Sequence, residues 1–135
     1  MAVLDRNAIL EAKDLPTETV DVPEWGGQVI VRTLTGEERD QYETSMIEIV
    51  GEGTNREAIP KLDNLRATLC ALTIVDSEGK RLFTTDDVVE LGNKSAAALD
   101  RIYDVSRRLS GLSEEDMEEL AEGLDMTRSD ATLSS

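Results

Sequence analysis

The sequence contains no histidine and only one cysteine, Cys70, in 135 residues. Histidine is the usual proton shuttle near neutral pH and the commonest zinc ligand, so its absence argues against both kinds of site. A single cysteine cannot form an intrachain disulfide, and Cys70 lies in the apolar run 69–72, where we expect a buried, unreactive thiol. We therefore predict no metal, no cofactor and no disulfide.

Aromatic residues and long apolar stretches are also scarce. The chain has one tryptophan, two tyrosines and one phenylalanine, so its core must be built from aliphatic side chains. No stretch approaches the ~20 apolar residues that a membrane span needs. Asp5 and Arg6 interrupt the N-terminal stretch that a signal peptide would occupy. We expect a soluble, intracellular protein that does not bind membranes.

Basic residues are few, with 14 lysines and arginines against 29 aspartates and glutamates and a net charge of −15. Neutralising phosphates requires a basic surface, so we expect no nucleic acid among the partners. Solubility is one explanation for the acidity. An acidic surface that faces a partner is the other.

Clustered carboxylates are the only candidates for catalysis or cation binding. Residues 86–87 and 114–116 are each acidic, but each cluster lies in the first turn of an expected helix, where carboxylates stabilise the helix dipole. The turn that begins at Asp76 has Lys80 and Arg81 where a calcium loop needs an oxygen ligand and a glycine. We predict that the protein is not an enzyme.

The clearest structural signal is a β-hairpin over about residues 18–33. Val20 and Val22 in one half, and Val29 and Val31 in the other, alternate with their neighbours at the strand period, so we expect these four side chains to face the core. Residues 23–27, which begin with proline and end with two glycines, are typical of the connecting loop. Thr35 follows, with Glu38 three residues on, which predicts a capping box and a helix.

Helical patterns dominate the rest of the chain. We expect helices at about 7–13, 36–50, 60–75, 84–91 and 94–109, with the helix at 60–75 the most buried and with Leu62 in its apolar stripe. Residues 51–60 are expected to be a loop, and residues 81–83 are a candidate third strand. The last helix begins at Ser113, and the polar residues after Asp125 are expected to be mobile.

These patterns predict an α+β fold, in which a small N-terminal antiparallel hairpin or sheet packs on a mainly helical domain of four to five helices. A chain of 135 residues is long enough for one core. We expect a single globular domain over residues 1–112, followed by an acidic C-terminal helix and mobile tail over residues 113–135.

Two features are candidates for partner binding. Trp25 sits in the hairpin loop, where its ring either folds back over the core or stands out as a binding anchor. Met117, Leu120 and Leu124 form a thin apolar stripe on the expected last helix. Such a stripe docks on its own domain or enters the groove of a partner.

Three collinear stretches stand out. The first reads DLPTETVDVPEWGG at 14–27 followed by VRTLTGEERD at 31–40, the second reads NLRATLCALTIVD with GKRLF within 64–83, and the third reads LGNKSAAALDRIYDVSRRLSGL at 91–112. Together they resemble the tail assembly chaperones of long-tailed (siphovirus-type) bacteriophages or prophages. The resemblance implies a non-catalytic factor in the host bacterial cytoplasm that binds the tape measure protein and keeps it soluble while the tail tube assembles. It also implies as partners a frameshifted longer form of the chain and the tail tube protein. A homo-oligomer is compatible with it.

Two other functions remain open at this point. A structural tail component, such as a terminator or connector subunit, would be present in purified virions, whereas an assembly chaperone would be absent. An acidic DNA mimic that inhibits a host protein would need carboxylates spaced like phosphates along one face. In this sequence they are spread over several expected helix starts and surfaces.

Overall fold

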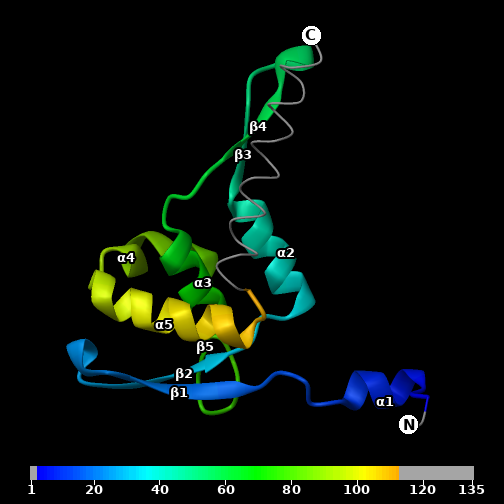
Figure 1. Ribbon diagram of the computed structural model, residues 1–135, viewed down its shortest axis with the longest axis vertical. Coiled ribbons are helices and arrows are strands. Elements are labelled where there is room, and N and C mark those ends of the chain that lie inside the picture. The colour runs from blue at the N-terminus through cyan, green and yellow to red at the C-terminus, as the bar shows by residue number, and fades with distance from the viewer. Residues whose placement is uncertain (1–2, 113–135) are drawn as a thin grey trace.

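The computed structural model describes residues 3–112 and has an α+β fold, as the sequence predicts. A three-stranded antiparallel sheet in the order β1-β2-β5 packs against helices, and a separate two-stranded sheet, β3-β4, projects from the body as an arm (Figure 1). The elements are, in chain order, α1 (Arg6–Glu11), β1 (Thr17–Val22), β2 (Gly27–Arg32), α2 (Gly36–Ser45), β3 (Ile47–Val50), β4 (Glu57–Pro60), α3 (Leu65–Thr73), β5 (Ile74–Val75), α4 (Val88–Gly92) and α5 (Ala96–Leu109), with 3-10 turns at Pro23–Trp25, Gly53–Asn55 and Thr85–Asp87.

The predicted hairpin is confirmed. β1 and β2 pair with Val20 opposite Val29, and Val20, Val22 and Val31 are buried. The connecting loop is a 3-10 turn followed by Gly26 at φ 76°, a left-handed conformation that glycine adopts without strain. The capping box that begins α2 is also confirmed, because Thr35 accepts from the Glu38 backbone N–H while the Glu38 side chain accepts from the Thr35 N–H.

The third strand of this sheet lies elsewhere than expected. β5 pairs with β2, with Val31 opposite Ile74, whereas Arg81 in the expected segment 81–83 forms only an isolated bridge with Val75. Ile74 and Val75 are β-branched and buried, which suits a strand in contact with the core. The expected helix 60–75 is therefore shorter, and its last two residues turn into the sheet.

The expected helix over 36–50 is confirmed only as far as Ser45, and the expected loop over 51–60 is wrong for residues 57–60. α2 ends at Ser45, and β3 and β4 form a second antiparallel hairpin. Ile47, Ile49 and Val50 are β-branched side chains that lose rotamer freedom in a helix and favour a strand. Gly51, expected to stop a helix, instead has φ 90° in the turn, where a Cβ would clash with the Asn55 carbonyl oxygen.

Helices α4 and α5 follow the sequence prediction closely. Thr84 and Asp87 form a capping box before α4, and Ser95 caps α5 by accepting from the Ala98 N–H.

The start of α3 differs from the prediction. Leu62, which the sequence pattern places in a helical stripe, instead lies in the connection between β4 and α3 and is 56% exposed. Asn64, with φ 55°, precedes the first turn of α3, so that helix begins later than expected.

The core has two clusters that meet at α3. One fills the space between the sheet, α3, α4 and α5, and the other lies between α2, α3 and the end of the described chain. A buried hydrogen bond of 2.8 Å between the hydroxyls of Thr73 and Ser106 joins α3 to α5. The first cluster contains Val20, Val22, Val31, Ala67, Cys70, Ala71, Ile74, Leu91, Ala98, Leu99 and Ile102, and the second contains Leu34, Tyr42, Met46, Leu69, Leu72 and Leu112.

The single thiol is buried, as the sequence predicts. Loss of hydration raises the pKa of the Cys70 thiol to about 12 from its ordinary 9.0. Since the thiolate is the reactive form, we expect thiol reagents at pH 8 to label native protein slowly and denatured protein quickly. Rapid labelling of the native chain would contradict this placement.

The raised pKa of the Cys70 thiol also makes the free energy of unfolding depend on pH. The contribution of this thiol is present below pH 9.0 and is lost as pH rises toward 12.

The expected division into a globular domain over 1–112 and a C-terminal helix and tail over 113–135 stays a prediction. The second part lies outside the residues that the structure describes.

Candidate partner-binding surface

The arm has two chemically different faces. In an antiparallel pair, residues directly opposite each other point to the same side. Ile47 lies opposite Pro60, and Ile49 lies opposite Ala58. These four side chains therefore give one wholly apolar face, which we call the arm face. The other side carries Glu48 opposite Ile59 and Val50 opposite Glu57, and is mixed.

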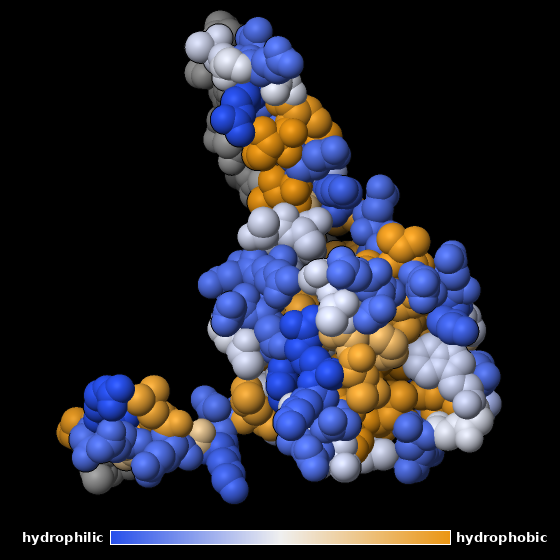
Figure 2. Space-filling view, turned by 180° about the vertical axis from the view of Figure 1, so that it is seen from behind, coloured by the Kyte–Doolittle hydropathy of each residue, from blue (hydrophilic) through white to orange (hydrophobic). Residues whose placement is uncertain are grey.

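The arm face is accessible. Ile49 is 54% exposed, and Figure 2 shows hydrophobic side chains gathered on the projecting arm. A two-stranded sheet is marginally stable in water by itself, and each of its strands has one edge outside the β3–β4 ladder. An apolar, projecting surface is typical of a site that another polypeptide covers.

The arm face continues into a cleft in the body. Ile47, at the foot of the arm, also lines a cleft of about 490 Å³ between α2, α3 and α4. Val88 and Val89 of α4 line the same cleft, and Val89 is 65% exposed. Arm and cleft together offer a continuous surface that is apolar on the arm face and mixed in the cleft. Its lining also includes Gln41, Ser45, Lys61, Asp63, Asn64, Thr68, Ala71, Leu72, Arg81 and Thr85.

Arg81 places an incompletely bonded guanidinium in this cleft. Its Nη1 lies 3.8 Å from Glu38 Oε2, while its Nε is buried and has no hydrogen-bond partner among the described groups. Glu38 itself is held more closely by Arg32, whose Nη2 donates to Glu38 Oε1 at 2.6 Å. A buried donor without an acceptor costs free energy. The Arg81 Nε is therefore an unmet donor inside the described part of the chain.

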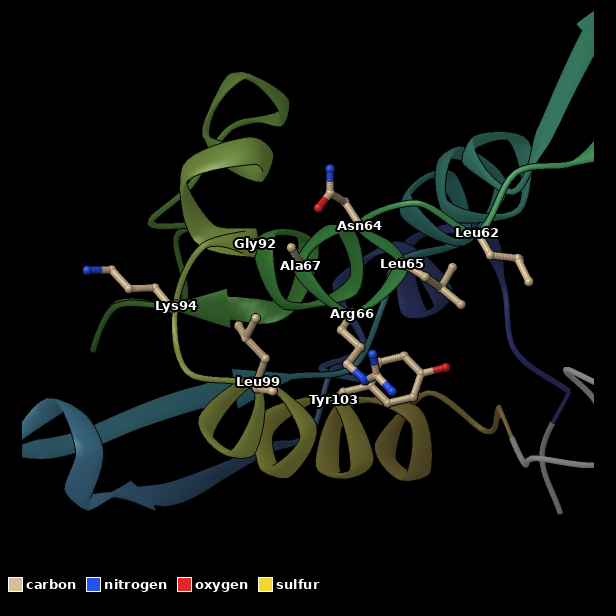
Figure 3. Close-up of a pocket in the computed structure, with 10 residues that line it drawn as sticks. Leu62, Asn64, Leu65, Arg66, Ala67, Gly92, Lys94, Leu99 and Tyr103 are labelled. Carbon is tan, nitrogen blue, oxygen red and sulfur yellow. The ribbon is translucent and has the colours of Figure 1, made fainter.

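A second cleft, of about 410 Å³, lies on the α5 side of α3. Figure 3 shows Leu62, Leu65 and Tyr103 at one end of it and Lys94 at the other. Arg66 of this lining forms an ion pair with Asp100. Gly92 packs so closely on the Asn64 side chain that a Cβ there would clash with Asn64 Oδ1. The lining of this cleft is therefore partly apolar, and its Gly92 and Asn64 are in close contact.

Trp25 packs against the core, which is one of the two placements that its sequence context allows. The ring is half-buried and packs against the first cluster. The adjacent Glu24 accepts two hydrogen bonds from Arg101, at 2.7 and 3.0 Å, and this pairing lowers the pKa of the Glu24 carboxyl. The β1–β2 loop lies away from the arm (Figure 1), so Trp25 and the arm face do not form one site. A binding role for Trp25 stays a prediction.

The other expected partner-binding residues, Met117, Leu120 and Leu124, lie outside the described residues, and their role stays a prediction. The arm face is the feature that the sequence interpretation missed. Its signal was present, because Ile47 and Ile49 alternate with Glu48 immediately before a glycine-containing turn.

No chemical site stands out in the part of the chain that the structure describes. Over residues 3–112, no three or more cysteine, aspartate or glutamate side chains gather in a way that could hold a metal ion. Within the same range, the longest and most apolar helices still fall short of what a membrane crossing requires. The described surface offers apolar contact and hydrogen bonding.

One family model matches most of the chain. Residues 5–123 match the family model described as phage tail assembly chaperone. Among solved structures, the chain is similar to the tail assembly chaperone of bacteriophage HK97, with a TM-score of 0.54 and 18% sequence identity. That match covers 76% of this chain and 94% of the other. At this identity the likeness shows a shared fold alone. No curated protein matches the sequence.

Proposed function

We propose that this chain, which belongs to the phage tail assembly chaperone family, binds the tape measure protein and keeps it soluble while the tail tube assembles. Its work is non-catalytic and takes place in the cytoplasm of the bacterial host. The proposal is supported by the family match for the process, and by the apolar arm face with its exposed Ile49 for the mode of action.

The arm face carries the proposal because its shape and chemistry suit reversible cover of another chain. A chaperone must bind apolar segments of its client without itself aggregating. The chain combines a small, localised apolar surface, on Ile47, Ile49, Ala58 and Pro60, with a net charge of −15 that keeps the complex soluble. Apolar contact at the arm supplies affinity.

The wider set of partners belongs to the same proposal. A frameshifted longer form of the chain would share residues of the short form and so present the same arm face. The tail tube protein would meet the chaperone when it polymerises around the client. The nucleotides that encode residues 110–135 give a simple check, because a slippery heptamer followed by an overlapping frame is expected there.

The alternatives are less well supported. A DNA mimic needs carboxylates that are free to imitate phosphates, yet many of the described ones are bound within the chain. Glu18, Glu24, Glu38 and Asp100 pair with arginines, and Asp5, Asp76 and Asp87 accept backbone N–H groups. A structural tail component would be found in virions, so mass spectrometry of purified particles separates it from a chaperone.

The arm face is testable by a single substitution. Ile49→Asp places a carboxylate on the apolar surface, and we expect about tenfold less tape measure protein to co-purify with the variant, since burying an unpaired charge in an interface is unfavourable. Ile9→Asp is the matched control, because Ile9 is 56% exposed on α1, away from the arm, and Ile49 is 54% exposed. Both variants should melt as wild type does.

Equal recovery of the client by wild type, Ile49→Asp and Ile9→Asp would remove the arm face from the binding surface. Equal loss in both variants would show that added charge, and not its position, weakens binding.

A further inference from the structure

Each of the two clefts beside α3 contains a lysine that makes no ion pair in the described part of the chain. Most lysines and arginines of that part do pair with carboxylates of the same chain. Lys61 lines the cleft between α2, α3 and α4, which we call the Lys61 cleft, and Lys94 lines the cleft on the α5 side of α3. Both lysines are exposed. Within residues 3–112, both ammonium groups are available to a carboxylate that a partner supplies.

Arg81 adds positive charge to the Lys61 cleft. Its side chain is 28% exposed, and its Nη1 lies 3.8 Å from Glu38 Oε2, which is too far for a hydrogen bond. Glu38 is held more closely by Arg32, at 2.6 Å. Asp63 is the one carboxylate among the described residues that line this cleft, so the lining has an excess of positive charge. The chain as a whole has a net charge of −15, so this positive charge is local.

The Lys61 cleft also offers apolar contact. Val88 is half-buried and Val89 is 65% exposed, and both line the cleft from α4. Ile47 lines it from the foot of the arm and also belongs to the arm face. The cleft volume of about 490 Å³ lies within the ~300–1,000 Å³ that is usual for ligand sites. A chain that occupies this cleft can therefore continue onto the arm face.

We propose that the Lys61 cleft binds a segment of the client in which an aspartate or glutamate lies beside an apolar side chain. The carboxylate pairs with the Lys61 ammonium, and the apolar side chain packs against Val88 and Val89. This assignment rests on the proposed function and deepens it, because it names the chemistry of the bound segment. A nucleic acid does not suit the cleft, because the net charge of −15 repels its many phosphates. A small anion would leave the two valines uncovered.

Charge reversal of Lys61 tests the position of the site. Lys61→Glu places a like charge against the client carboxylate, and we expect roughly tenfold less tape measure protein to co-purify with it than with the wild-type chain. The Lys61 backbone N–H donates to the Met46 carbonyl at 2.7 Å, and the substitution leaves this bond in place. Lys94→Glu is the matched control, because Lys94 is also exposed and lines the other cleft, and its recovery of the client should equal that of wild type. Equal recovery with Lys61→Glu and wild type, or equal loss in both variants, would overturn the proposal and leave the chaperone function standing.

A double-mutant cycle tests the chemistry of the bound segment. The probes are overlapping synthetic peptides of the tape measure protein encoded in the same genome, each compared with versions in which one aspartate or glutamate is replaced by its amide. For one such peptide, we expect the amide to weaken binding to the wild-type chain roughly fivefold, the upper end for an exposed ion pair. The same amide should leave binding to Lys61→Met unchanged, because the pair is already lost in that variant. An equal loss with both chains, or no peptide that shows this difference, would overturn the proposal. Failure of the wild-type chain to recover the whole client would instead contradict the proposed function itself.

Discussion

Val31→Asp is expected to abolish cooperative folding of the chain. Val31 is fully buried in β2, the middle strand of the three-stranded sheet, with Glu18 opposite it on β1 and Ile74 opposite it on β5. The substituted carboxylate would lie among the aliphatic side chains of the first core cluster. An unpaired charge at such a site costs free energy comparable to the whole stability of a small domain, roughly 5–15 kcal/mol.

Circular dichroism during heating measures this effect directly. We expect no cooperative transition for Val31→Asp, and a transition close to that of wild type for Thr19→Asp, which adds the same charge at an exposed position of the edge strand β1. A wild-type melting curve for Val31→Asp would show that this side of the sheet faces solvent.

Leu69→Ala is expected to lower the free energy of unfolding by about 2–5 kcal/mol, the usual range for a buried leucine. Leu69 is fully buried on α3 and packs in the cluster that joins α2 to α3. Truncation removes apolar contacts and leaves a cavity whose walls, on α2 and α3, are held by their own packing.

Chemical denaturation of Leu69→Ala and of Val89→Ala tests the placement of this cluster. Val89 is 65% exposed on α4, so its truncation is expected to change the free energy of unfolding by less than about 0.5 kcal/mol. A loss at Val89 that equals or exceeds the loss at Leu69 would move the centre of the core away from α3.

The N-terminal hairpin and the helix caps could be predicted because their signals are local. Val20 and Val29 show the strand period on both sides of a proline- and glycine-containing loop, and the Thr35–Glu38 capping box needs only four residues. Such features depend on neighbours in the sequence, so the sequence contains most of the information that determines them.

The arm could not be placed with the same certainty because short apolar runs suit a helix or a strand equally. Met46, Ile49 and Val50 have helical spacing with Tyr42, so the sequence pattern predicts a helix there. The structure pairs Ile49 with Ala58 across a turn instead. This pairing depends on a partner strand nine residues away in the chain, Glu57–Pro60, which carries a proline and reads as a loop by itself.

The candidate site was missed for the same reason. Its apolar side exists only because Ile47, Ile49, Ala58 and Pro60 are brought to one side of a two-stranded sheet. The cleft beside it depends on long-range packing of α4 against α3. The sequence did point to the family, because the resemblance spreads over collinear segments and does not require any single element to be placed correctly.

The most direct measurement of the central claim is the solubility of the tape measure protein encoded in the same genome. It should be expressed in the bacterial host alone, with this chain, and with the Ile49→Asp variant. We expect the client to be largely insoluble alone, to become soluble and co-purify with the wild-type chain, and to return mostly to the insoluble fraction with Ile49→Asp. A soluble fraction that is the same with and without the chain would contradict its role as a chaperone of the tape measure protein.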